Sequence, residues 1–207
     1  MFCVSKLPIS TSNAAKAAAQ NRMGMTFRTH GAWLSDHTAD PDVCRFMQVG
    51  AARFWPAHFL DSAIRVHRES EDSEATLHNL ISRMSGSLSF NGDIAQWSDT
   101  ATERMKAGVA IYKKIRPLLS GKVRFPLPQP RTDRDWDAVQ IDRPDGRLLF
   151  AYRMEGNPAL ALGEISGAWQ LLLGTVGATV NPDGQIELSP SGAALFIEAN
   201  SPINLLS

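Results

Sequence analysis

Apolar positions recur every three or four residues along three stretches between residues 40 and 121, which is the spacing of one face of a helix. The first stretch follows Asp40-Pro41. Asp is a favoured N-cap residue and the φ of Pro suits the first turn of a helix, so this pair indicates a helix start. We expect this helix to end near Trp55-Pro56. Its predicted buried face consists of Val43, Phe46, Met47, Gly50, Ala51 and Phe54.

Two further helices are predicted from the same spacing. One carries Leu77, Leu80, Ile81 and Met84, and Gly86 closes it. The other opens at Thr100, whose spacing to Glu103 is that of a capping box, and ends at Pro117 and Gly121. The predicted buried face of this third helix is Ala101, Met105, Val109, Tyr112, Ile115 and Leu119.

Short apolar runs precede these helices. Residues 58–66 and 87–90 are compatible with strands, and a further strand is expected to close at Leu34 and Ser35. The polar residues 67–74 indicate a surface loop, and Asn91-Gly92 indicates a turn. Strands alternating with helices of this length predict βα units and a parallel sheet.

The pattern changes after the Pro-rich stretch 126–130, which reads as a linker. Apolar and polar residues then alternate on either side of Pro144-Asp145-Gly146, as in a β-hairpin, and turns are predicted at 181–184 and 189–192. We therefore expect three parts: a poorly specified tail at 1–25, an α/β domain at 26–125 and an antiparallel β domain at 126–207.

Composition narrows the class of protein. The apolar fraction of 43% over 207 residues is enough for a buried core, and Lys plus Arg balances Asp plus Glu at 21 each. The chain therefore has no excess of positive charge that would indicate a nucleic-acid partner. No apolar run is long enough to span a membrane. Cys3 and Cys44 have no metal or disulfide spacing, and without the apolar core of a secretory signal the default compartment is cytoplasmic.

The first 35 residues contain no Asp or Glu; their charged residues are Lys6, Lys16, Arg22 and Arg28. An acid-poor start of this kind is compatible with an organelle transit peptide or with a tail unrelated to the fold.

The candidate chemistry lies in residues 31–41, GAWLSDHTADP. Asp36 can be a catalytic acid or an Asx-turn at a strand-to-helix junction. A triad of Ser35, Asp36 and His37 is excluded because neighbouring residues of a strand point to opposite faces. A metal site of His58, Asp61 and His67 fits no ligand pattern, so no metal and no cofactor is expected.

Trp33 to Thr38 reads Trp-Leu-Ser-Asp-His-Thr, which resembles the Trp-x-Ser-Asp-x-Thr motif of the family 36 α-galactosidases (melibiases), a group of retaining glycoside hydrolases. The similarity continues through RFMQVGAARFWPAHF, GSLSFNGDIAQWSD and AIYKKIRPLLSG and covers roughly residues 28 to 155. The resemblance implies the last three βα units of a (β/α)₈ TIM barrel, followed by a small antiparallel β-sandwich.

By this resemblance, Asp36 is the general acid/base that protonates the departing glycosidic oxygen of an α-galactoside. Active sites of such barrels lie at the carboxyl ends of the strands. Trp33, Ser35 and Asn91 are then candidate substrate-binding residues, with Phe27 and Trp33 as the apolar surroundings that raise the pKa of an acid. Asn91 and Asp93 can equally form a turn, and Trp55, Trp97 and Trp136 can stack on sugar rings or pack in the core.

A retaining mechanism also needs a nucleophilic carboxylate, which the family supplies from an earlier strand. No acidic residue precedes Asp36, and residues 20–27 do not match the family's Cys-Ser-Gly-Gly-Gly segment. Two functions therefore stay open: an α-galactosidase acting through Asp36, and a catalytically incomplete fragment that binds carbohydrate or a partner. We expect an exposed apolar surface on the barrel-facing side of this incomplete barrel. Such a surface predicts that the chain is marginally stable, forms a homo-oligomer or binds a partner that completes the barrel.

Overall fold

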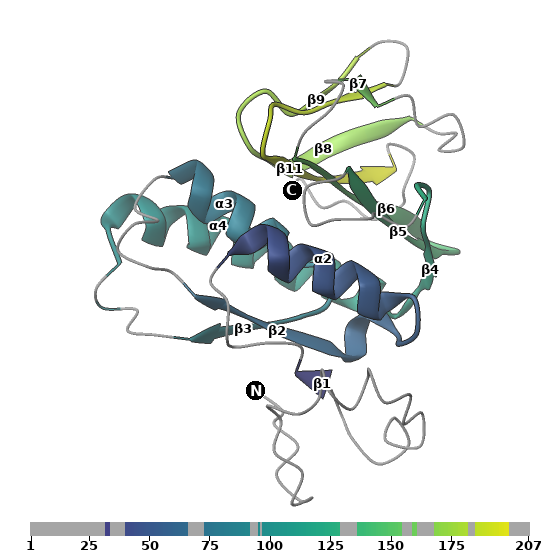
Figure 1. Cartoon of the computed structure of the whole chain (residues 1–207), viewed down its shortest axis with the longest axis horizontal. Coiled ribbons are helices and arrows are strands. Elements are labelled where there is room, and N and C mark those ends of the chain that lie inside the picture. Colours follow the sequence, from purple (N-terminus) through teal and green to yellow (C-terminus); the bar gives the residue numbers. More distant parts are fainter. Residues whose placement is uncertain are drawn as a thin grey trace, which may run out of the picture.

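The structure is a computed structural model that describes residues 32–33, 40–65, 73–91, 95, 97–128, 136–154, 159–160, 168–181 and 185–198. Side chains of the residues at 32–33, 62–65, 73, 75, 91 and 159–160 are not described. Within these ranges a parallel sheet with three helices is followed by antiparallel strands (Figure 1). The predicted order of strands and helices, including the change to antiparallel strands, is confirmed.

The parallel sheet has three strands in the order β1 (Ala32–Trp33), β2 (Leu60–Arg65), β3 (Ser87–Asn91). β1 pairs with β2 from Ala32 opposite Leu60, and β2 pairs with β3 from Asp61 opposite Ser87 to Arg65 opposite Asn91. The helices α2 (Pro41–Ala52) and α3 (Ser73–Ile81) lie between consecutive strands in the chain, and α4 (Asp99–Ile115) follows β3. This is the β-α-β-α-β-α order expected from the sequence, and all three strands run in the same direction.

Helix α2 begins as predicted. Asp40 accepts hydrogen bonds from the backbone N–H of Asp42 at 2.9 Å and of Val43 at 3.4 Å, and Pro41 occupies the first turn. The helix ends at Ala52, three residues before Trp55.

The predicted buried face of α2 is wrong. Phe54, assigned to the core, is 68% exposed, and none of the six predicted positions is fully buried. The reason is that α2 lies between β2 and the antiparallel strand β5 (Asp137–Arg143), so it buries polar side chains that find partners there. The buried residues are Cys44, Arg45, Gln48, Val49 and Ala52.

Helices α3 and α4 bury the predicted apolar residues, with Val109 only partly covered. The two helices approach closely at Gly108, where an added Cβ would lie 1.9 Å from Leu80 Cδ2. The predicted capping box at Thr100 is wrong: Ser98 is the N-cap and accepts from the Ala101 N–H at 3.2 Å. Glu103 instead forms an exposed ion pair with Lys106 at 2.7 Å.

The antiparallel part contains a five-stranded sheet in the order β4-β5-β6-β11-β8, namely Lys122–Arg124, Asp137–Arg143, Gly146–Arg153, Gly192–Glu198 and Trp169–Gly174. A smaller sheet has the order β7-β10-β9, namely Ala159–Leu160, Ile186–Glu187 and Thr179–Val180. The predicted hairpin is confirmed, with Arg143 opposite Gly146 and a φ of 147° at that glycine.

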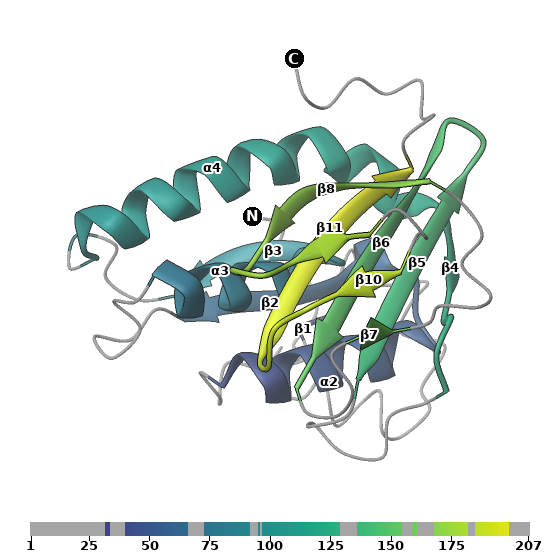
Figure 2. The same cartoon turned by 90° about the horizontal axis from the view of Figure 1, so that it is seen from above.

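The core joins the two parts of the chain. In Figure 1 the helices lie between the parallel sheet and the antiparallel strands, and Figure 2 shows α4 running beside β8 and β11. One apolar cluster contains residues of α3, of α4 and of the facing side of the five-stranded sheet. A second cluster, with Leu149, Ile186 and Phe196, fills the space between the two antiparallel sheets.

Candidate functional site

Trp33 and Asn91, two of the candidate site residues, belong to the parallel sheet, and the structure describes only part of the candidate set. Ser35 and Asp36 lie outside the described residues, as does Phe27. Trp33 is the last residue of β1 and Asn91 the last residue of β3, each with a described backbone and no described side chain. The roles predicted for these residues therefore stay predictions.

The pairing register fixes the relative heights of Trp33 and Asn91. Trp33 lies opposite Asp61, near the start of β2, whereas Asn91 lies opposite Arg65, at its end. Four residues of strand at about 3.3 Å each separate the two levels by about 13 Å along the strand direction. Asn91 alone is thus at the carboxyl edge, and Trp33 lies well below it.

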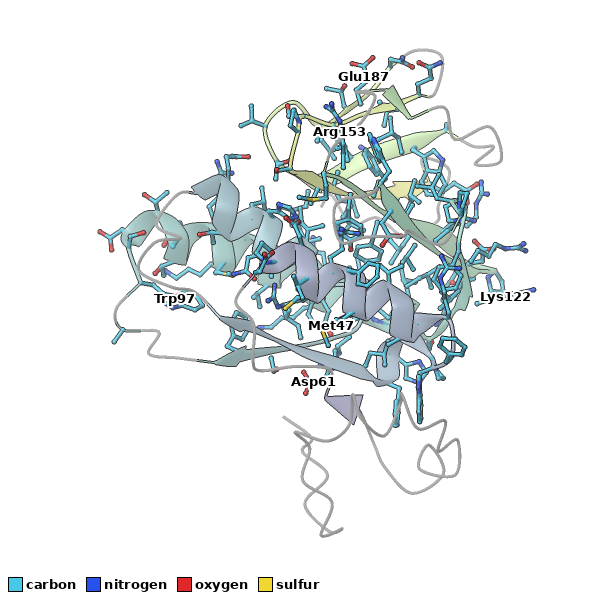
Figure 3. The ribbon with its side chains drawn as sticks, viewed as in Figure 1. Met47, Asp61, Trp97, Lys122, Arg153 and Glu187 are labelled. Carbon is cyan, nitrogen blue, oxygen red and sulfur yellow. The ribbon has the colours of Figure 1, made fainter. Side chains whose placement is uncertain are left out.

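The face of the parallel sheet away from the helices carries polar side chains. Ser89 Oγ donates to Asp61 Oδ1 at 2.8 Å, and Ser87 Oγ donates to the His58 carbonyl at 2.9 Å. Figure 3 shows Asp61 pointing away from the helices. Leu60 and Leu88, one position along in each strand, pack on the helix side instead. The apolar face expected from the sequence is therefore not found among the described side chains.

Asp61 is the feature of this face that sequence reasoning missed, since we considered it only as a metal ligand. Burial raises the pKa of its carboxyl, and the hydrogen bond from Ser89 acts against that rise. The sequence did contain a signal for this position. Successive side chains of a strand point to opposite faces of the sheet, so an apolar Leu60 on the core side places Asp61 on the opposite face.

The three tryptophans are packing residues in this structure. Trp55 is 7% exposed and stacks on Phe59, with ring centroids 5.5 Å apart. Trp97 and Trp136 are partly buried against the two main apolar clusters. Their use as sugar-stacking platforms finds no support here.

A buried ion pair lies on the other side of the helix layer. Arg45 Nη1 of α2 is 2.9 Å from Asp137 Oδ2 of β5, with side-chain exposures of 0% and 1%. Burial raises the pKa of Asp137 to about 6, although the Arg45 guanidinium acts in the opposite direction. This pair links α2 to the antiparallel sheet and has a structural role.

Within the described ranges, no three His, Cys, Asp or Glu residues gather closely enough to hold a metal ion. Cys44 is buried, with its sulfur 2.9 Å from Arg83 Nη2, and burial raises the pKa of its thiol. In the same part of the chain, no helix combines the length and apolar character needed to cross a membrane.

Comparison with known proteins gives a match by structure alone. No protein-family model matches the chain, and no curated protein does. Among solved structures, it is similar to the GH36 α-galactosidase AgaB from Geobacillus stearothermophilus, with a TM-score of 0.60 and 18% identity. For the α-galactosidase from Lactobacillus brevis the TM-score is 0.59 and the identity 16%. For the galactosidase domain of the α-galactosidase-sucrose kinase AgaSK the TM-score is 0.58 and the identity 18%.

Each of these matches covers 84% of this chain and 26% of the other. Variants of a further GH36 α-galactosidase from Geobacillus stearothermophilus, AgaA, were solved in complex with raffinose and with stachyose. The chain therefore has the fold of part of a GH36 α-galactosidase and spans about a quarter of such a protein, 26% of its length.

Proposed function

We propose that this chain is a portion of an α-galactosidase-type glycoside hydrolase, with residues 26–125 forming the last three βα units of its barrel and Asp36 as the general acid/base. The observation that carries the proposal is the structural similarity over 84% of the chain to GH36 α-galactosidases. The Trp-x-Ser-Asp-x-Thr motif at residues 33–38 is independent support, because it comes from the sequence alone.

The position of Asp36 in the chain suits this role under one condition. If the chain stays extended after Trp33, three residues at about 3.3 Å each bring residue 36 to the height of Ile64, one residue below the level of Asn91. Strict alternation would turn residue 36 toward the helices, because Trp33 lies opposite Asp61. The proposal therefore requires the strand to end at Ser35, so that Asp36 belongs to the loop, where barrel active sites are built.

The chemistry assigned to Asp36 is proton transfer. In a retaining mechanism the acid gives its proton to the glycosidic oxygen while a second carboxylate attacks the anomeric carbon. No acidic residue precedes Asp36 in this chain, so we propose that the attacking carboxylate comes from outside it. Raffinose and stachyose, found in complexes of AgaA variants, define the proposed ligand class as α-galactosides.

The test is hydrolysis of an aryl α-galactoside by the purified chain, with and without sodium azide, compared with Asp36→Asn. Azide replaces the absent nucleophile: its nitrogen forms the bond to the anomeric carbon, the bond to the phenol oxygen breaks, and Asp36 protonates that oxygen. We expect no release of phenol without azide, and an azide-dependent release that falls sharply in Asp36→Asn.

Three outcomes would overturn parts of this proposal. Release that persists unchanged in Asp36→Asn removes Asp36 from the mechanism. Release without azide that is lost in Asp36→Asn places the nucleophile within this chain. If azide has no effect on the correctly folded protein, the alternative function applies, a fragment that binds carbohydrate or a partner without turnover.

A further inference from the structure

The five-stranded sheet ends in two edge strands of different chemistry. In the order β4-β5-β6-β11-β8, the outer strands are β4 and β8. β4 carries two exposed cations, Lys122 and Arg124, and Figure 3 shows Lys122 at the margin of the molecule. Charged side chains protect a sheet edge, because they hinder another strand from pairing with its free backbone groups. The edge at β4 is therefore protected.

The edge at β8 has no such protection. Residues 168–181, which include β8, contain no charged residue. Among the strands that the structure describes, β8 pairs with β11 alone, so the backbone groups on its other side have no described partner strand. Gln170 and Leu171 are exposed, and residues 172–174 are partly exposed. An uncharged edge strand of six residues is a template on which another strand can pair.

The leucines of β8 lie on both faces of this edge. Leu171 is 36% exposed and lies opposite Phe196, which belongs to the apolar cluster between the two antiparallel sheets. Leu172 and Leu173 pack partly against the cluster on the helix side. Val176, in the turn that follows, is 71% exposed. Two of the four exposed large apolar side chains in the described part of the chain thus lie in or next to β8, and a strand with apolar side chains would remove this surface from water.

The chemistry of this edge selects a second copy of the same strand. Its free N–H and C=O groups require an extended backbone, and its leucines require apolar, uncharged side chains on both faces. β8 itself meets both requirements, and two uncharged strands do not repel each other. The charged strand β4 does not meet them. In a two-fold antiparallel pair each β8 occupies the free edge of the other, which closes the assembly at two copies.

We propose that the chain forms a homodimer through antiparallel pairing of β8 with β8 of a second copy, which joins the two five-stranded sheets into one continuous sheet. The inference is independent of the glycosidase proposal, since it rests on the edges of the antiparallel sheet. It also differs from the association expected from the sequence, which concerned the barrel-facing side. Two strands of six residues form a small interface, so we expect a weak dimer that forms between micromolar and millimolar protein concentration.

Sedimentation velocity at increasing protein concentration measures this association. We expect a concentration-dependent equilibrium of monomer and dimer in the wild type. Leu171→Lys should weaken dimerisation by about tenfold or more, because a symmetric interface contains the new charge twice. Phe54→Lys is the matched control with no expected change, since it places the same charge on an apolar side chain that is 68% exposed just after α2. A wild type that stays monomeric, or equal weakening in both variants, would overturn the proposal.

Backbone hydrogen exchange of the wild type locates the contact and needs no substitution. We expect the β8 amides that point away from β11 to exchange several-fold more slowly at high than at low protein concentration, with no change in β4. Gln170→Lys, at an exposed position of the same strand, should abolish this slowing while the circular dichroism spectrum stays that of the wild type. Slowing confined to other strands would contradict the pairing. Slow exchange at every concentration would assign the edge to another segment of the same chain and also overturn the proposal.

Discussion

Asp137 and Arg45 form an ion pair in which both side chains are almost fully buried. Taking two charges out of water is costly, and their attraction offsets that cost only in part. The raised pKa of Asp137, about 6, reflects this balance, because burial outweighs the effect of Arg45. The pair therefore fixes how α2 meets β5, and it makes the stability of the protein dependent on pH.

The pH dependence has a definite sign. The folded protein holds a proton on Asp137 up to about pH 6, whereas the pKa of an unperturbed Asp carboxyl is 3.8. Protonation thus favours the folded state, so the contribution is complete below pH 3.8 and is lost as the pH rises through about 6. We expect the free energy of unfolding of the wild type to fall relative to that of Asp137→Asn between pH 4 and 7, by about 2–3 kcal/mol. Urea unfolding of both proteins at each pH measures this, and parallel curves would contradict it.

The sequence allowed some of the important residues to be predicted and others not. The family motif indicates Asp36, whose role stays a prediction, whereas the cap at Asp40 followed from Asp-Pro at the start of an apolar period and is confirmed. Asp61 and Arg45 were missed because the partners that explain them are far away in the chain, Ser89 for one and Asp137 for the other. The pattern of apolar and polar residues in one helix or strand does not show which side chain from a distant part of the chain will pack against it.

Helix α2 shows the same limit at the scale of an element. Its length and its start follow from local signals, but its buried face depends on two sheets that pack against it. Gln48, for example, is buried because its side chain donates to the Arg83 carbonyl at 3.2 Å and to Ser85 Oγ at 3.3 Å. In α3 the predicted apolar residues are buried, but so are the polar Thr76, His78 and Asn79, because α3 contacts α4, β11, β8 and β2.

The start of α4 offers a direct comparison of two candidate caps. Ser98 accepts a hydrogen bond from the Ala101 N–H, whereas Thr100 lies exposed inside the first turn. We expect Ser98→Ala to lower the free energy of unfolding by about 1 kcal/mol, within the range of N-cap substitutions. Thr100→Ala should leave it almost unchanged. Thermal unfolding of both variants measures the difference, and a larger loss in Thr100→Ala would restore the capping box.

The contact between α3 and α4 depends on a glycine. An added Cβ at Gly108 would overlap Leu80 Cδ2, whereas nothing lies within 4 Å of a Cβ added at Gly50. We expect Gly108→Ala to destabilise the protein by about 1–3 kcal/mol through overpacking. Gly50→Ala should stabilise it by about 0.5–1 kcal/mol through helix propensity. Denaturant unfolding of the pair checks this, and a stabilised Gly108→Ala would show that the helices can separate at no cost.

At the scale of the whole molecule, one apolar cluster connects the helices to the five-stranded sheet. Ile115 of α4, Leu80 of α3 and Phe150 of β6 all belong to it and are fully buried. The spacing of apolar residues predicted both the α/β part and the antiparallel β part of the chain. This spacing shows only which face of a helix or strand is apolar. Which apolar faces meet is decided by the packing, and here the helices present theirs to the antiparallel sheet.

The shared cluster predicts that the two halves unfold together. We expect a single urea transition that is identical by tryptophan fluorescence and by far-UV circular dichroism, because separating the halves would expose the common core. The fragments 1–125 and 126–207 should each fail to give a cooperative transition. Two resolved transitions in the full chain, or a folded fragment 126–207, would show that the halves are independent.

The central proposal is that the carboxyl ends of the parallel strands contribute to an α-galactoside site around Asp36, and an NMR titration with raffinose tests this proposal most directly. Sucrose is the matched control ligand, because it is raffinose without the α-galactosyl group. The account predicts that raffinose, and not sucrose, shifts the backbone amide signal of Asn91, and that Asp36→Asn weakens this response. Equal shifts with both sugars, or shifts confined to the antiparallel strands, would contradict the account.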